Sequence, residues 1–171
     1  EDVYFAQFGS AENPLTDVLL LLHNPIRREM MDARRILEVI TELEQKRSPN
    51  LELALGCFFE WWKVFSNCTA RLLDIKESVV YSWIDEQQKF RKVNVGQEFA
   101  AFERIGRRES INEVLNFVSD EELEMSRSSL SSCKKVLRLV KHVKKAENVM
   151  YESFGVEEKL FSECGAVYVG G

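Results

Sequence analysis

The sequence predicts an all-α fold, an up-down-up-down four-helix bundle that forms a single soluble domain over residues 1–171. Three observations support this prediction. Apolar residues recur every three or four positions over four long stretches, and short breaks separate the stretches. The chain has only eight Gly and three Pro, fewer than the turns of a β-sandwich usually need. Its 171 residues are 45% hydrophobic, which is enough for one sizeable core.

The first helix is expected to begin near Thr16, after an irregular arm formed by residues 1–14. Pro25 lies inside the apolar pattern and lacks a backbone donor, so it predicts a kink or a displaced first turn. Residues 45–50 form the next break. The apolar positions of this helix are Leu19, Leu20, Leu22, Ile26, Met30, Ala33, Ile36, Leu37 and Ile40.

The second helix is expected to run from residue 51 to about residue 92, which is longer than most globular helices and favours a bundle. Phe58, Trp62 and Phe65 share one face by helical spacing, and we expect that face to lie in the core. Residues 93–96 form a connection, and the third helix follows to about residue 118.

The fourth helix has a start signal at Ser119, which forms a capping box with Glu122. Gly155 is expected to cap its end, so residues 156–171 would form a short tail. The serine-rich segment 126–132 is a poor helix interior and predicts either a flexible patch or a tight helix crossing.

Composition excludes several classes of function. The net charge of −5 argues against nonspecific nucleic-acid binding, and no run of eighteen apolar residues predicts a membrane span. None of the four Cys residues has the two-residue spacing of a zinc or redox motif, so we expect buried, reduced thiols in a reducing intracellular compartment, the cytoplasm or an organelle interior. The chain starts at Glu1 instead of Met, so a processed or trimmed form is expected, and any targeting peptide would not be visible.

Catalytic motifs are missing from the sequence, which has no glycine-rich phosphate loop, no Gly-x-Ser-x-Gly and no His-Glu-x-x-His. We therefore expect a protein that is not an enzyme. Its two histidines are either core residues or metal ligands: His23 lies among leucines, and His142 shares a side with apolar residues. Glu77 either is solvated or faces the core, where a carboxylate needs a cation as its partner. Glu147 follows His142 by five positions.

Three segments together resemble hemerythrin-like (HHE cation-binding) domains over roughly residues 14–154. They are His23-Asn24-Pro25-Ile26-Arg27-Arg28, Cys57-Phe58-Phe59-Glu60-Trp61-Trp62-Lys63-Val64-Phe65, and Glu77-Ser78-Val79-Val80-Tyr81-Ser82-Trp83-Ile84-Asp85. His142 with Glu147 is similar to the closing motif of that family. The resemblance implies a bundle centre that holds two irons, and it carries the role of metal ligand onto His23, Glu77, His142 and Glu147.

The chain departs from the family pattern at several ligand positions. Leu73 stands where the family has a His one turn before Glu77, and the histidine pair of the third helix falls at about Gly96 and Ala100. An apolar side chain inside the site indicates a core repacked after the metal was lost. We therefore expect no cofactor, with iron at a residual His/Glu site as the alternative.

Two surface features favour a protein partner. Trp61 points away from the core face of its helix, so it is either an exposed contact residue or buried under the tail or a loop. Arg138, Lys141 and Lys145 line one stripe that is either solvated or docks an acidic partner. The expected function is a non-catalytic structural or protein-interaction module. The alternative is a metal-binding domain that senses or carries oxygen or iron. The oligomeric state stays open.

Overall fold

The computed structural model describes residues 14–83, 85–86 and 101–169, which form helices and short connections without a strand. Four long helices make up the bundle: α1 (Pro14–Gln45), α2 (Leu51–Ile75), α4 (Ala101–Arg127) and α5 (Ser132–Val169). A π-helical segment, η1 (Lys76–Tyr81), continues α2 without a break. These elements confirm the predicted all-α bundle.

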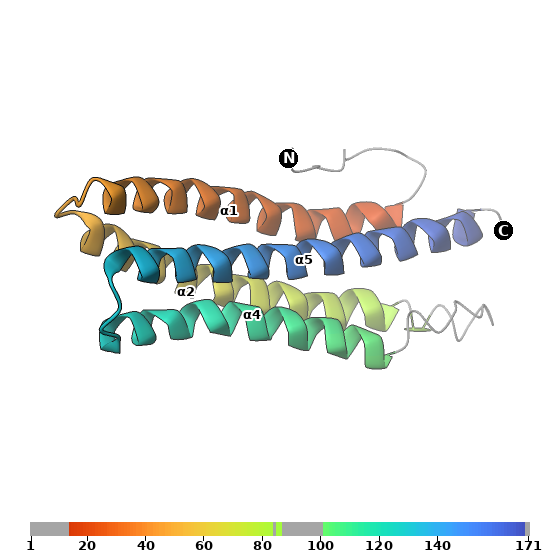
Figure 1. The fold of residues 1–171 in the computed structure, drawn as a ribbon. Helices are drawn as coiled ribbons and strands as arrows, with labels where there is room; N and C mark the ends of the chain where they lie inside the picture. The colour runs from red at the N-terminus through yellow and green to blue at the C-terminus, as the bar shows by residue number, and fades with distance from the viewer. Residues whose placement is uncertain (1–13, 84, 87–100, 170–171) are drawn as a thin grey trace.

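Successive helices run in opposite directions, so the bundle is up-down-up-down (Figure 1). Helix α5 packs against α1 and α4, and α2 packs against the same two helices. Helices α2 and α5 therefore occupy diagonal corners of the bundle (Figure 1). No described helix is long and apolar enough to cross a membrane.

The core is built from the predicted apolar faces. Phe58, Trp62 and Phe65 are buried, which confirms the face predicted for α2. Trp62 is fully buried, and its indole Nε1 donates a hydrogen bond to the backbone carbonyl of Leu115, 3.1 Å away. This bond joins the middle of α2 to α4, so the largest core side chain has both its apolar ring and its polar atom satisfied.

The predicted capping box at Ser119 and Glu122 is wrong, because α4 continues through both residues to Arg127. The Ser119 hydroxyl donates to the Leu115 carbonyl one turn earlier, which is a bond inside the helix and not a cap. Buried Val118 and Met125 continue the inward face across this point, and their burial outweighs the local capping signal. The chain instead turns at 128–131, inside the predicted serine-rich segment.

The predicted helix end at Gly155 is also wrong. Helix α5 passes through this glycine to Val169, so residues 156–169 are helix and not a tail. The reason is that Phe154, Leu160 and Phe161 are buried and extend the apolar stripe of α5. Leu160 and Phe161 pack with Leu19, Val80 and Tyr81 in a second apolar cluster at this end of the bundle.

Other boundaries changed less. Helix α1 begins at Pro14, slightly before the predicted Thr16, and Pro25 is inside the helix well beyond its first turn. The predicted arm apart from Pro14, the end of the second helix near residue 92, the connection 93–96 and the first residues of the third helix lie outside the described residues.

The thiols of Cys57, Cys68 and Cys133 are free and exposed, so the prediction of buried cysteines is wrong for these three. Each lies on an outward helix face, where helical periodicity overrides the general tendency of cysteine to be buried.

Replacing Trp62 with Phe should lower the free energy of unfolding by about 2–3 kcal/mol, because the smaller ring leaves unfilled volume in the core and the Leu115 carbonyl loses its partner from α2. Urea denaturation followed by circular dichroism measures the change. Val39→Ala on the exposed side of α1 is the control and should stay within about 0.5 kcal/mol of the parent. An equal loss in both variants would contradict a structural role for the indole bond.

Candidate functional site

The structure does not bring the four predicted metal ligands together. His23 contacts carboxylates of α5, whereas His142 contacts Glu121 of α4, with Nδ1 3.5 Å from its Oε2. Glu147 pairs with Arg34 of α1. Glu77 is half-buried in η1. Among the residues that the structure describes, no group of three or more His, Cys, Asp or Glu side chains is arranged to hold a metal ion.

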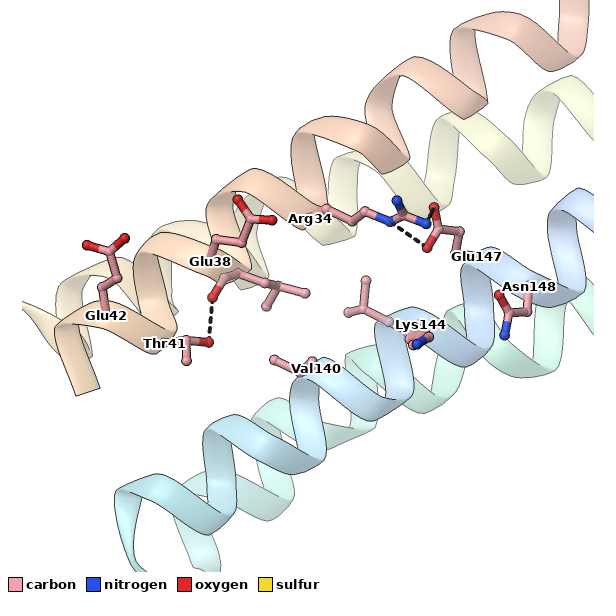
Figure 2. A pocket seen from close by; sticks show the side chains of 10 residues that line it. Arg34, Glu38, Thr41, Glu42, Val140, Lys144, Glu147 and Asn148 are labelled. Carbon is pink, nitrogen blue, oxygen red and sulfur yellow. Dashed lines mark hydrogen bonds and ion pairs between the residues drawn. The ribbon is translucent and has the colours of Figure 1, made fainter. Parts of the chain in front are cut away.

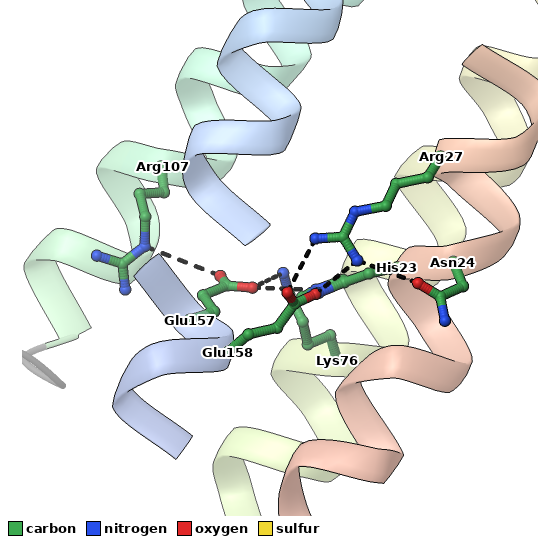
Figure 3. Close-up of polar contacts among 7 residues, drawn as sticks. All are labelled: His23, Asn24, Arg27, Lys76, Arg107, Glu157 and Glu158. Carbon is green, nitrogen blue, oxygen red and sulfur yellow. Dashed lines mark hydrogen bonds and ion pairs between the residues drawn. The ribbon is translucent and has the colours of Figure 1, made fainter. Parts of the chain in front are cut away.

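His23 instead belongs to a buried ion network at one end of the bundle (Figure 3). Its Nδ1 is 2.8 Å from Oε1 of Glu158, and its Nε2 is 3.2 Å from Oε2 of Glu157. Both acids come from the part of α5 beyond Gly155. His23 and Glu157 are almost completely buried, so the imidazole is held between two carboxylates with almost no access to water.

Three further cations neutralise the two carboxylates (Figure 3). Lys76 Nζ of η1 is 2.6 Å from Glu157 Oε2, and Arg107 Nε of α4 is 3.8 Å from Glu157 Oε1. Arg27 of α1 makes two contacts of 2.8 and 2.9 Å with Glu158 and also donates to Asn24 Oδ1. Each of α1, η1 and α4 thus contributes one cationic side chain to the acids of α5. We call this group the ion network; it consists of His23, Arg27, Lys76, Arg107, Glu157 and Glu158.

The π-helical winding of η1 helps to place Lys76. Hydrogen bonds in a π-helix join residues five apart, so Lys76 and Tyr81 lie close to one face. Lys76, Val80 and Tyr81 are all buried, whereas Val79 between them is exposed. A regular α-helix would turn Tyr81 about 140° away from Lys76 and would not bury both.

One aromatic ring, Phe154, covers part of the ion network. Phe154 stacks on the His23 ring, with centroids 4.0 Å apart and planes 11° from parallel. The Arg27 guanidinium and the Lys76 ammonium lie 5.6 and 5.7 Å from the centroid of the same Phe154 ring. Cations over a ring face are attracted by its quadrupole, so Phe154 stabilises both charges while it excludes water.

The electrostatics of the network favour ionised carboxylates. Burial alone would raise the pKa of Glu157, but its hydrogen bond with His23 and the charge of Lys76 lower that pKa to about 2. Burial also opposes ionisation of Glu158, and contacts with His23 and Arg27 hold its pKa below the ordinary value. For Tyr81, burial and the neighbouring Glu157 charge raise the pKa, so this phenol stays protonated.

The network does not fit a metal centre. A metal ion at Glu157 would have to displace the Lys76 ammonium, whose Nζ lies 2.6 Å from Glu157 Oε2. Leu73 of α2, which precedes Lys76, is buried in the apolar core and offers no ligand atom. The carboxylates are therefore paired with internal cations. These ion pairs join α5 to α1, η1 and α4.

A cavity of about 580 Å³ opens between the C-terminal part of α1 and the N-terminal half of α5 (Figure 2). Leu37, Val140 and Val143 form its apolar lining. The buried carboxylate of Glu147 lies at one end, where the Arg34 guanidinium meets both of its oxygens at 2.8 Å. The predicted ligand Glu147 is thus neutralised by a paired Arg and closes the end of this cavity (Figure 2).

The predicted partner-binding residues lie on two different faces. Trp61 is half-buried on α2, where it stacks on Phe65 with centroids 5.3 Å apart and packs against the core. Arg138 of α5 is half-buried and pairs with Glu121 at 3.2 Å. Lys141 and Lys145 are exposed on α5, and Lys145 Nζ lies 5.0 Å from the ring centroid of Phe117. Trp61 therefore does not share a surface with the basic stripe.

Sequence reasoning missed the two acids and Lys76. Treating Gly155 as a helix end assigned Glu157 and Glu158 to a tail, although Phe154, Glu157 and Phe161 have the spacing of one helix face. Arg27 lay inside the segment that resembles the family but received no role. No sequence signal marks the π-helical turn that buries Lys76.

The ion network should make stability depend on acid pH. The folded pKa of Glu157, about 2, is below its ordinary value of 4.5, so its contribution is present above pH 4.5 and is lost as pH falls toward 2. The shift corresponds to about 3 kcal/mol. Urea denaturation from pH 7 to pH 2 measures this loss.

The variant Glu157→Gln should lose about 3 kcal/mol at pH 7, since His23 and Lys76 stay buried beside a neutral amide. Its stability should then vary less between pH 4.5 and 2 than that of the parent. Glu152→Gln, at an exposed position of the same helix, is the matched control. If both variants keep the acid dependence of the parent, Glu157 is not its source.

No family model, curated protein or solved structure matches this chain. The resemblance to hemerythrin-like domains therefore stays a prediction, and the all-α bundle is what the structure itself establishes.

Proposed function

We propose that this chain is a non-catalytic, metal-free helical bundle that binds an acidic segment of another protein on its α4–α5 face. On this proposal, the bundle is a variant of the hemerythrin-like fold in which internal ion pairs have replaced the diiron centre. The observation that carries the metal-free half of the proposal is the Lys76 ammonium against the Glu157 carboxylate, because it supplies inside the bundle the positive charge that a metal would bring.

The remaining predicted ligands support the same reading. Glu147 is neutralised by Arg34, whose Nε and Nη2 each contact one carboxylate oxygen. The His142 ring contacts Glu121, which also pairs with Arg138. Glu147, and the Glu121 carboxylate that His142 contacts, thus each have an arginine as partner. A bundle whose interior charges are balanced in this way acts through its surface.

The proposed binding surface, called here the basic face, lies along α5 and its edge with α4. Lys141 and Lys145 are exposed on α5, and the exposed Leu137 lies on the same side of the helix. Phe117 of α4 is partly exposed beneath Lys145. Apolar anchors flanked by lysines favour an acidic amphipathic helix, whose apolar side chains would pack on Leu137 and Phe117.

A protein segment suits this face better than a nucleic acid. The chain carries a net charge of −5, which repels a long polyanion beyond the local stripe. The apolar anchors also have no counterpart in a phosphate backbone, whereas a helix of leucines and glutamates matches both the charge and the apolar contacts.

Binding should be measured with a synthetic amphipathic helix of Leu and Glu, by fluorescence anisotropy at two salt concentrations. We expect binding that weakens with salt and falls at least about tenfold in the double variant Lys141→Glu with Lys145→Glu. The matched control reverses one exposed charge of α1 and one in the turn that follows it, Arg35→Glu with Lys46→Glu, and should bind as the parent does. Equal binding of both double variants, or tighter binding to duplex RNA than to the peptide, would refute the proposed surface.

Metal content tests the other half of the proposal. Protein purified without chelators from iron-rich medium should contain far less than one iron per chain and show no iron absorption bands. Stoichiometric iron that disappears in His23→Ala would overturn the metal-free function and support the metal-binding alternative. His142→Ala, at the histidine outside the ion network, is the matched control in that case.

A further inference from the structure

A row of apolar side chains lies on the outward face of α2 and η1, away from the core. Its members are exposed to solvent although they are aliphatic or thiol side chains. We call this row the α2 seam. Its members are Leu53, Cys57, Val64, Cys68, Ile75 and Val79. Exposed apolar side chains that gather along one helix face indicate a contact with another protein.

Successive members of the α2 seam are separated by four, seven, four, seven and four residues. The pattern therefore repeats every eleven residues, or about 3.67 residues per turn. This period is close to that of the α-helix itself, so the members stay on one stripe along the helix. From Leu53 to Val79 the stripe is about 39 Å long at 1.5 Å per residue.

The same spacing reads identically from either end, with Ser66 at its centre. A second copy of α2 that runs antiparallel therefore meets the stripe in register. Leu53 then faces the second copy's residue 79, Cys57 its residue 75, and Val64 its residue 68. This self-complementarity is what an isologous twofold interface requires.

Charge supports the antiparallel register. The two positions that interrupt the apolar row are Glu60 and Arg71, and both are exposed on the same flank of the seam. A twofold axis that passes between the two helices at the level of Ser66 leaves each flank on its own side and brings Glu60 of one copy almost level with residue 71 of the other. The interruptions thus become two symmetric pairs of opposite charge across the contact.

We infer that the α2 seam is a homodimer interface in which two copies of this chain pair antiparallel along α2 about Ser66. Because α2 and α5 occupy diagonal corners, the basic faces of both copies stay open in the dimer (Figure 1). The inference does not rest on the proposed function, since it concerns a different helix and its readout is molar mass.

The first experiment is sedimentation equilibrium of the full chain under reducing conditions, over a range of concentrations. The expected mass is twice 19.9 kDa, with a concentration-dependent return to monomer. Val64→Glu should weaken the dimer at least tenfold, because two carboxylates would be buried at its centre. The matched control Leu123→Glu, at an exposed site of α4, should remain dimeric, and circular dichroism should show both variants fully helical.

The second experiment tests the register by mild oxidation. In a background with Ser in place of Cys68, Cys133 and Cys164, Ile75→Cys should cross-link to Cys57 of the other copy. The two positions within one chain are 18 residues apart on one helix, too far for an internal disulfide. Without Ile75→Cys, that background should stay uncross-linked, because Cys57 of the two copies lies at opposite ends of the seam.

Two results would overturn the inference. The first is a chain that stays monomeric at all concentrations, or a dimer that Val64→Glu leaves intact. Either would show that the α2 seam does not join two copies of this chain. The other is efficient cross-linking through Cys57 alone, which would show a parallel pair. If the parent chain is monomeric but still binds the acidic peptide, the dimer interface is refuted and the proposed function is not.

Discussion

A buried carboxylate organises one end of this bundle. Glu157 is almost fully buried and ionised, and an ion without a partner in such surroundings would be too costly to keep. It is tolerated because His23 of α1, Lys76 of η1 and Arg107 of α4 all reach it. The requirement to meet this one charge sets the register of α5 against the other elements, since a shift by one residue would turn Glu157 away from its cations.

Other features at this end follow from the same requirement. The π-helical turn buries Lys76 and Tyr81 together, and Phe154 shields the imidazole and two cations from water. In the hemerythrin-like bundles that the sequence resembles, metal ions supply positive charge at the centre. Here lysine and arginine side chains supply positive charge to the buried carboxylates.

Two outward helix faces have complementary roles in the proposals made here. The α2 seam would join two copies, and the diagonal position of α5 would then present two basic faces on one particle. A partner that carries two acidic segments would bind such a dimer more tightly than a monomer, because the second contact forms within one complex. The cavity between α1 and α5 has the Arg34–Glu147 ion pair at one end.

The sequence by itself determined the four helices and the core face through Phe58, Trp62 and Phe65, because apolar periodicity reflects burial directly. It located the bundle's interior histidine at His23 but not its partners. Local signals at Ser119 and Gly155 were misleading, because the apolar stripes of α4 and α5 run on past both residues, and their burial outweighs a cap. Only the tertiary structure decided that Glu157 meets Lys76, since that pairing joins residues 81 positions apart through a π-helical turn. The periodicity of one helix carries no information about which charge of another helix will lie opposite it.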